Sequence, residues 1–120
     1  MDKLRCVAID DQPLDLEIIK FISNKVASIE MVAYYTDPLE AISHVIDDNI
    51  GLVFLDFNMG KISALDIIKL LPPAVMVIIV SAERLHELEA LKMDVVDIVI
   101  KPYNLEGFVR AVSKALYRIS

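Results

Sequence analysis

Hydrophobic residues along this chain form short continuous runs that alternate with stretches in which they recur every three or four positions. The runs at residues 52–55 and 75–80 contain apolar side chains only, and the second is mostly β-branched. Such runs are typical of strands that are buried on both faces inside a parallel sheet. We therefore predict strands at residues 4–9, 31–35, 52–55, 75–80 and 95–100.

Each predicted strand is followed by a stretch with the spacing of a helix. Pro13 suits the first turn of the first helix, because its missing N–H has no hydrogen-bond partner to lose there. The fourth stretch carries Leu85, Leu88 and Leu91 among charged residues, so we expect a thin, exposed helix. The helices are expected at residues 13–26, 38–47, 63–71, 83–92 and 105–119. In the first helix, the residues expected to face the core are Leu14, Ile18, Ile19, Phe21, Ile22 and Val26.

Five strands in strict alternation with five helices predict an α/β fold. Crossovers between parallel strands are right-handed, and they place helices on both faces of one doubly wound, five-stranded parallel sheet. The length of 120 residues suits one hydrophobic core, and the sequence contains no repeat and no linker. We therefore expect residues 1–120 to form a single domain.

Composition and charge narrow the environment and the partners of this domain. Hydrophobic residues make up 56% of the chain, yet no apolar run approaches the roughly 18 residues that a membrane helix needs. The first residues lack the pattern of a signal peptide, so we expect a cytoplasmic domain that does not engage the membrane. The net charge of −6 argues against nucleic-acid binding by this domain. The single Cys6 excludes a disulfide framework within the chain and is expected to be a small buried hydrophobe.

Charged and polar residues stand at the ends of four predicted strands. Asp10 and Asp11 follow the first strand, Asp56 the third, Ser81 the fourth and Lys101 the fifth. The carboxyl ends of parallel strands meet at one edge of the sheet, where ligands of α/β proteins bind. We therefore expect these five side chains to lie close together.

Such a set of side chains suits the chemistry of phosphoryl transfer. Carboxylates about 4 Å apart repel by roughly 4 kcal/mol per pair at an effective dielectric constant of 20, so the set requires a cation. Mg²⁺ is a hard ion that takes oxygen ligands and fits this requirement. Lys101 supplies a mobile positive charge and Ser81 a hydroxyl donor. Asp56 stands alone at its strand end and is the predicted nucleophile.

Four motifs at these strand ends carry a resemblance to a known family. Taken in order, they resemble the signature blocks of response-regulator receiver domains, and the similarity covers essentially the whole chain. It implies a flavodoxin-like sheet with strand order 2-1-3-4-5. The segments at residues 9–14 and 94–97 are similar to receivers that precede a LytTR-type DNA-binding domain, and whether such an output domain follows in the full protein stays open. The motifs are Ile9-Asp10-Asp11, Leu55-Asp56-Phe57-Asn58-Met59, Val80-Ser81-Ala82 and Lys101-Pro102.

The resemblance implies that Asp56 takes a phosphoryl group from the phosphohistidine of a sensor histidine kinase or a phosphotransfer protein. The reaction would depend on Mg²⁺, held by Asp10, Asp11, Asp56 and the backbone carbonyl of Asn58. Phosphorylation would then switch the contacts of the domain with a partner or within a dimer. No enzyme activity is implied beyond the phosphorylation of Asp56 and the later loss of its phosphoryl group.

Further roles are implied around this acceptor. Ser81 and Lys101 would contact the phosphoryl oxygens, and the peptide bond between Lys101 and Pro102 would be cis. Asn58 and Glu83 resemble the positions that flank the attacking water, which implies that they tune the lifetime of the phosphoryl group; the alternative is that both are solvated loop residues. A homodimer would use the face made by the helix at 83–92, the strand at 95–100 and the helix at 105–119.

Three positions depart from the pattern of the family. Gly60 stands where proline is usual, Ala64 where glycine is usual, and Ile98 in the place of an aromatic residue that rotates on activation. Without that ring, the usual coupling between movement of Ser81 and an inward swing of the aromatic is in question. These departures keep open a second interpretation, a non-phosphorylated pseudo-receiver that acts as a protein-binding module.

Two other classes fit the sequence poorly. A phosphatase of the haloacid dehalogenase type needs Asp-x-Asp after its first strand, whereas Asp11 and Gln12 follow Asp10, and its cap insertions exceed this length. A dinucleotide-binding module needs a glycine-rich turn after the first strand, and none is present.

Overall fold

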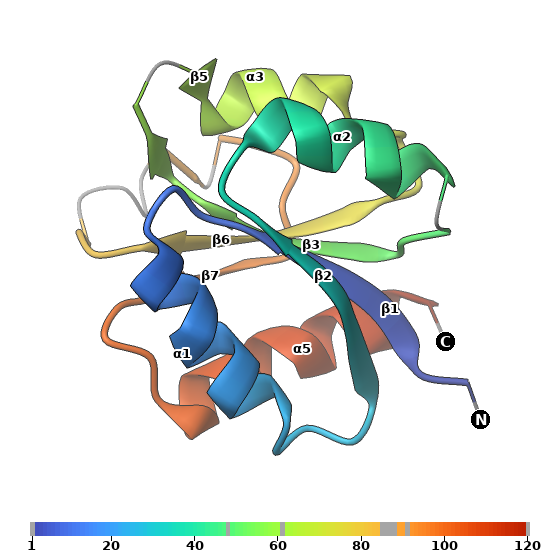
Figure 1. Cartoon of the computed structure of the whole chain (residues 1–120). Coiled ribbons are helices and arrows are strands. Elements are labelled where there is room, and N and C mark those ends of the chain that lie inside the picture. The colour runs from blue at the N-terminus through green and yellow to red at the C-terminus, as the bar shows by residue number, and fades with distance from the viewer. Residues whose placement is uncertain (1, 48, 61, 85–88, 91, 120) are drawn as a thin grey trace.

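Strands and helices alternate along the chain as the hydrophobic pattern predicts (Figure 1). The computed structural model describes residues 2–47, 49–60, 62–84, 89–90 and 92–119. Residues 85–88 and 91 include the predicted leucines Leu85, Leu88 and Leu91, which lie outside the described part. The elements are β1 (Leu4–Ile9), α1 (Pro13–Ser23), β2 (Ile29–Tyr35), α2 (Pro38–Asp47), β3 (Leu52–Asp56), β4 (Asn58–Met59), β5 (Ile62–Ser63), α3 (Ala64–Leu70), β6 (Met76–Ser81), β7 (Asp97–Ile100) and α5 (Leu105–Ile119).

Five parallel strands form the main sheet in the order β2-β1-β3-β6-β7. Counted along the sheet's own strands, this is the order 2-1-3-4-5, so the predicted topology is confirmed. The central strand β3 is buried along its whole length, which explains why its sequence is continuously apolar up to Asp56. β4 and β5 form a separate antiparallel pair after β3, which the sequence pattern did not predict.

Helices cover both faces of the sheet, with α1 and α5 on one side and α2 and α3 on the other (Figure 1). On the first side, the ring of Phe54 from β3 stacks on the ring of Phe108 from α5 at a centroid distance of 5.0 Å, and both side chains are fully buried. On the second side, Leu55 of β3 and Ile67 of α3 belong to one buried cluster. No described helix is both long and apolar enough to cross a bilayer.

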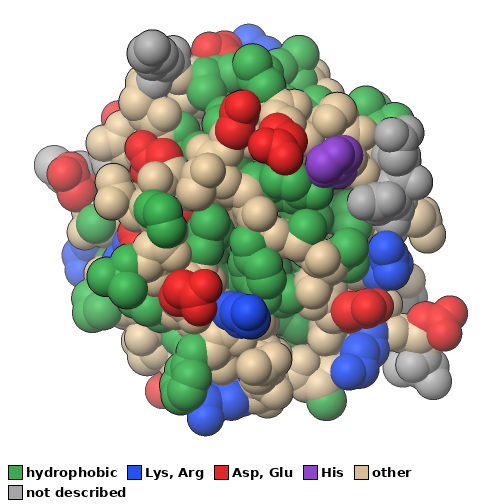
Figure 2. All heavy atoms as spheres, in the orientation of Figure 1, with side chains coloured by type: hydrophobic (Ala, Val, Ile, Leu, Met, Phe, Trp, Pro, Cys, Tyr) green, Lys and Arg blue, Asp and Glu red, His purple; other side chains and the backbone are tan. Residues whose placement is uncertain are grey.

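The predicted core face of α1 is partly wrong. Leu14 is 74% exposed, Phe21 is 66% exposed and Ile18 is also exposed. The helix instead buries Leu16, Ile19 and Ile22 against the sheet and ends at Ser23. Apolar residues occupy both sides of this helix, so their spacing alone could not decide which side faces inward. As a result, an apolar stripe of Leu14, Ile18 and Phe21 lies on the surface of α1, and apolar side chains are visible there in Figure 2.

The phenylalanine stack should contribute strongly to stability. We expect Phe108→Ala to lower the free energy of unfolding by about 3–5 kcal/mol, because it removes a fully buried ring and leaves a cavity beside Phe54. Urea denaturation measures the change. The matched control is Phe21→Ala on the exposed side of α1, which should change stability by less than about 1 kcal/mol. Equal losses in the two variants would contradict this description of the core.

Candidate functional site

The sheet places three of the predicted site residues at one edge. Ile9 of β1 pairs with Leu55 of β3, so Asp10 and Asp56 emerge side by side just beyond this pair. Asp56 in turn pairs with Val80 of β6, which directly precedes Ser81. The strand register therefore fixes the positions of Asp10, Asp56 and Ser81 before any side-chain contact is considered.

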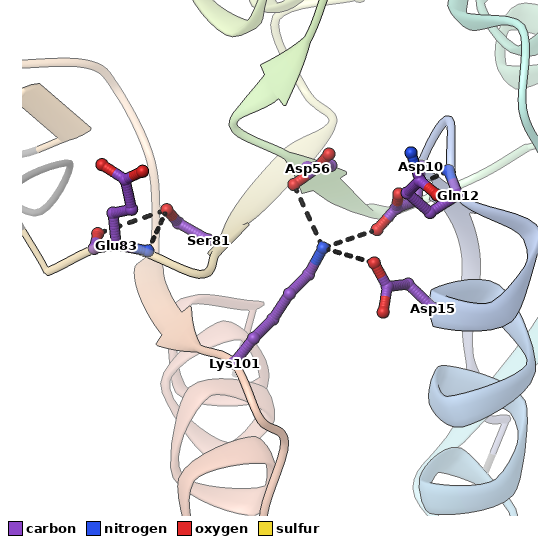
Figure 3. Close-up of polar contacts among 7 residues, drawn as sticks. All are labelled: Asp10, Gln12, Asp15, Asp56, Ser81, Glu83 and Lys101. Carbon is purple, nitrogen blue, oxygen red and sulfur yellow. Dashed lines mark hydrogen bonds and ion pairs between the residues drawn. The ribbon is translucent and has the colours of Figure 1, made fainter.

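Lys101 joins the carboxylates at this edge through its ammonium group (Figure 3). Its Nζ lies 2.8 Å from Oδ2 of Asp15, 3.1 Å from Oδ2 of Asp10 and 3.4 Å from Oδ1 of Asp56. The lysine follows β7, and its peptide bond to Pro102 is cis, as the family resemblance implied. An ammonium group has three N–H donors, and here three carboxylates surround it.

Asp10, Asp11 and Asp56 form a carboxylate cluster that could hold a metal ion. Each offers an oxygen within 4.8 Å of the others. Asp10 and Asp56 are buried, whereas Asp11 is exposed at the rim. A set of carboxylate oxygens on a partly open edge matches the oxygen ligands and retained waters that Mg²⁺ prefers. The donor set therefore fits this ion.

The pKa values of the cluster reflect burial and mutual repulsion. Burial raises the pKa of Asp56 to about 6, the charge of Asp10 adds to the rise, and Lys101 opposes it. Burial also raises the pKa of Asp10, although the backbone N–H of Gln12 and the ammonium of Lys101 pull it down. Burial alone would lower the pKa of Lys101, but its hydrogen bonds to Asp15 and Asp10 outweigh burial and raise it. Lys101 is therefore fully charged at neutral pH.

In Figure 3, Ser81 and Glu83 lie on one side of Asp56, and Asp10 lies on the other. The hydroxyl of Ser81 is buried, donates to the backbone carbonyl of Glu83 at 3.2 Å and accepts from its backbone N–H at 3.1 Å. Asn58 begins β4 two residues after Asp56, and its side chain is exposed. The structure thus brings Lys101 to the carboxylates, while the Ser81 hydroxyl contacts the loop that follows β6.

Two residues of this edge were missed by the sequence analysis. Asp15 lies in the first turn of α1 and makes the shortest contact with Lys101. A signal was available, because side chains in a helix tilt toward its N-terminus and Asp15 follows closely after the Asp10-Asp11 pair. Tyr103 is the second residue, and its buried hydroxyl has no hydrogen-bond partner among the described residues. Burial and the charges of Asp10, Asp15 and Asp56 raise its pKa.

Comparison with known proteins identifies one family for the chain. The family model of the response regulator receiver domain matches residues 6–113. The sensory transduction protein LytR of Staphylococcus haemolyticus is 25% identical over 120 residues, which cover 98% of this chain and 47% of that protein. A protein-glutamate methylesterase/protein-glutamine glutaminase of Geobacter sulfurreducens is 32% identical over 106 residues, which cover 85% of this chain and 29% of that protein. The chain thus spans about half, or less, of the length of these relatives.

The fold is shared with solved receiver structures. The signal receiver domain of the putative response regulator NarL from Mycobacterium tuberculosis superimposes with a TM-score of 0.81 at 22% identity, covering 98% of both chains. At that identity the similarity concerns the fold, and it agrees with the observed five-stranded sheet.

The raised pKa of Asp56 predicts a pH-dependent stability difference. Because folding raises this pKa from 3.8 to about 6, ionised Asp56 destabilises the fold; the penalty is absent below pH 3.8, grows between pH 3.8 and 6, and is complete above. Without metal, we expect Asp56→Asn to be more stable than the wild type at pH 8 by up to about 3 kcal/mol, with a much smaller gain at pH 4.5.

Thermal or urea unfolding in EDTA at the two pH values measures this difference. Asp66→Asn is the matched control, because Asp66 is an exposed carboxylate in the first turn of α3 and should show no such trend. An Asp56→Asn variant that is no more stable at pH 8 than at pH 4.5, relative to the wild type, would contradict the effect of burial and repulsion on Asp56 described here.

Proposed function

The chain belongs to the response regulator receiver domain family, and from this membership we propose that Asp56 accepts a phosphoryl group from a phosphohistidine. The donor is a sensor histidine kinase or a phosphotransfer protein. One observation carries the proposal: a buried carboxylate at the tip of the central strand lies 3.4 Å from the lysine ammonium and within 4.8 Å of two further carboxylates.

The proposed reaction is a displacement at phosphorus. An oxygen of the Asp56 carboxylate attacks the phosphorus, the new O–P bond forms, and the N–P bond to the histidine of the donor breaks. The imidazole leaves with the electron pair and takes up a proton from water. The charge of Lys101, within 3.4 Å of Asp56, supports a role in binding the phosphoryl oxygens as negative charge moves onto Asp56.

Mg²⁺ is the proposed cofactor. Asp10, Asp11 and Asp56 would hold it, together with the backbone carbonyl of Asn58. When bound, the ion supplies positive charge that neutralises the carboxylates and the phosphoryl oxygens. Burial is the main cause of the raised pKa of Asp56, and the charge of Asp10 adds to it. A divalent cation relieves this repulsion, which supports the assignment.

The neighbouring polar residues have proposed roles in the lifetime of the phosphoryl group. Ser81 is buried one residue beyond the partner of Asp56 in β6, so a rotation of its hydroxyl away from the backbone of Glu83 would offer a donor to a phosphoryl oxygen. Asn58 and Glu83 are exposed at the same edge, so solvent reaches both. In the later hydrolysis, water attacks the phosphorus, the O–P bond to Asp56 breaks, and inorganic phosphate, the carboxylate and a proton are released.

The proposed output is a change in protein contacts. Asp97 of β7 forms ion pairs with Arg110 and Lys114 of α5 at 3.9 and 3.3 Å, so charged groups line this side of the domain. We propose that this face, with the segment at residues 83–92, forms partner or homodimer contacts that phosphorylation switches. Ile98 lies here, packed against the core, so any signal passes without an aromatic ring at this position.

The second candidate is a pseudo-receiver that binds proteins without being phosphorylated. Gly60, Ala64 and Ile98 favour it, because they depart from the family pattern. The joint presence of Asp10, Asp56 and Lys101 in one contact network favours phosphorylation. The two functions differ in one measurable property, the covalent state of Asp56 after exposure to a phosphodonor.

Incubation with Mg²⁺ and acetyl phosphate tests the proposal. We expect the intact mass of the wild type to increase by one phosphoryl group, because Asp56 is the acceptor. Asp56→Asn should show no gain, and the control Asp66→Asn should behave like the wild type. Folded wild-type protein that binds Mg²⁺ but gains no mass would support the pseudo-receiver instead.

The lifetime of the phosphoryl group offers a second test. If Glu83 and Asn58 orient the attacking water, replacing both with alanine should slow the loss of the phosphoryl group by about threefold or more. The loss is followed by intact mass after removal of the phosphodonor, with Asp66→Asn again as the control. An unchanged rate in the double variant would show that both are ordinary solvated loop residues.

A further inference from the structure

Asp15 is the partner that Lys101 holds most closely. The Nζ–Oδ2 distance of 2.8 Å is shorter than the contacts to Asp10 at 3.1 Å and to Asp56 at 3.4 Å. In Figure 3, Asp56 lies above the ammonium, whereas Asp15 lies to its right, next to Asp10. A lysine that leans toward Asp15 therefore leans away from the phosphoryl acceptor.

Lys101 cannot add a partner without giving one up. Its three N–H donors face three carboxylates, so a phosphoryl oxygen must replace one of the existing acceptors. The side chain of Asp10 is 1% exposed, so loss of the lysine would leave a buried charge without a partner, which is costly. The side chain of Asp15 is 24% exposed, so water can solvate it when the lysine departs. Of the two partners other than the acceptor Asp56, Asp15 is thus released at the lower cost.

A phenol with a buried hydroxyl group lies two residues beyond Lys101. The hydroxyl of Tyr103 is buried and has no hydrogen-bond partner within the described part of the chain. The charges of Asp10, Asp15 and Asp56 act on this phenol, so it lies within their electrostatic reach. A buried O–H without an acceptor is costly, so this phenol favours a nearby negative charge that is not already paired.

We propose that Asp15 is a positioning residue that holds Lys101 away from Asp56 in the unphosphorylated domain and releases it to the phosphoryl group. The inference rests on the proposed phosphorylation of Asp56. It adds a competition, because the Asp15 carboxylate and the phosphoryl oxygens share one ammonium. The strength of the Asp15–Lys101 ion pair then sets how readily the domain is phosphorylated.

Removal of the Asp15 charge tests the competition. With Asp15→Asn, Lys101 loses its closest ionic partner and becomes available to Asp56, so phosphorylation by acetyl phosphate and Mg²⁺ should be about three- to tenfold faster at subsaturating donor. Initial rates come from intact mass at several donor concentrations. The matched control is Glu17→Gln, which removes an equal charge from the exposed side of α1 and should stay within about 1.5-fold of the wild type.

A double-mutant cycle separates positioning through Lys101 from a general effect of charge or folding. In a Lys101→Ala background, Asp15→Asn should change the rate by less than about 1.5-fold, because the group for which Asp15 competes is gone. The same acceleration in that background, or an Asp15→Asn variant that is no faster than the wild type, would overturn the proposal while leaving phosphorylation of Asp56 intact. Absence of labelling in the folded wild type would overturn both.

Discussion

One ammonium group among four carboxylates is the interaction on which this site depends. Asp10, Asp11, Asp15 and Asp56 lie at one edge of the sheet, and Lys101 contacts three of them. Carboxylates a few ångströms apart repel by several kcal/mol per pair at the effective dielectric constant of a protein surface, and a single lysine cannot neutralise four charges. Burial, together with the charges of Asp10 and Asp11, raises the pKa of Asp56. A site of this kind is poised to take up a cation and then to exchange partners.

Such repulsion persists only because the sheet holds the carboxylates in place. The last four residues of β1 pair with the first four of β3 in the interior of the sheet, and β3 is buried throughout. Helices pack on both faces, and the stacked rings of Phe54 and Phe108 tie β3 to α5. Moving Asp56 away from Asp10 would require a break in this pairing, so the charges must be relieved by ions and protons. The rigid core therefore keeps the mutually repelling carboxylates together at this edge.

The sequence predicted the sheet and most of its edge because both follow from local patterns. Buried strands need continuous apolar runs, and Asp10, Asp56, Ser81 and Lys101 are found where those runs stop. The role of Asp15 was not predicted because its contact with Lys101 joins residues 86 positions apart and depends on the direction of a side chain on a helix. The inward face of α1 escaped for a different reason, since apolar residues occur on both of its sides and only packing against α5 and the sheet selects one. Sequence patterns predict strands and helices well, but which of several possible contacts a side chain makes depends on the packing of the folded chain.

The misassigned residues of α1 also place the charge network next to an accessible surface. Leu14 is adjacent in sequence to Asp15, is 74% exposed, and begins the stripe that continues through Ile18 and Phe21. If Asp56 accepts a phosphoryl group from a phosphohistidine, as proposed above, the donor protein must approach this edge, and the exposed apolar stripe beside it offers area to bury. Contact with Leu14 would then act on the turn that carries Asp15, and through Asp15 on Lys101. Docking of a donor protein and release of the lysine would thus be coupled through one turn of α1. A small phosphodonor does not contact this turn, so it would not trigger the release.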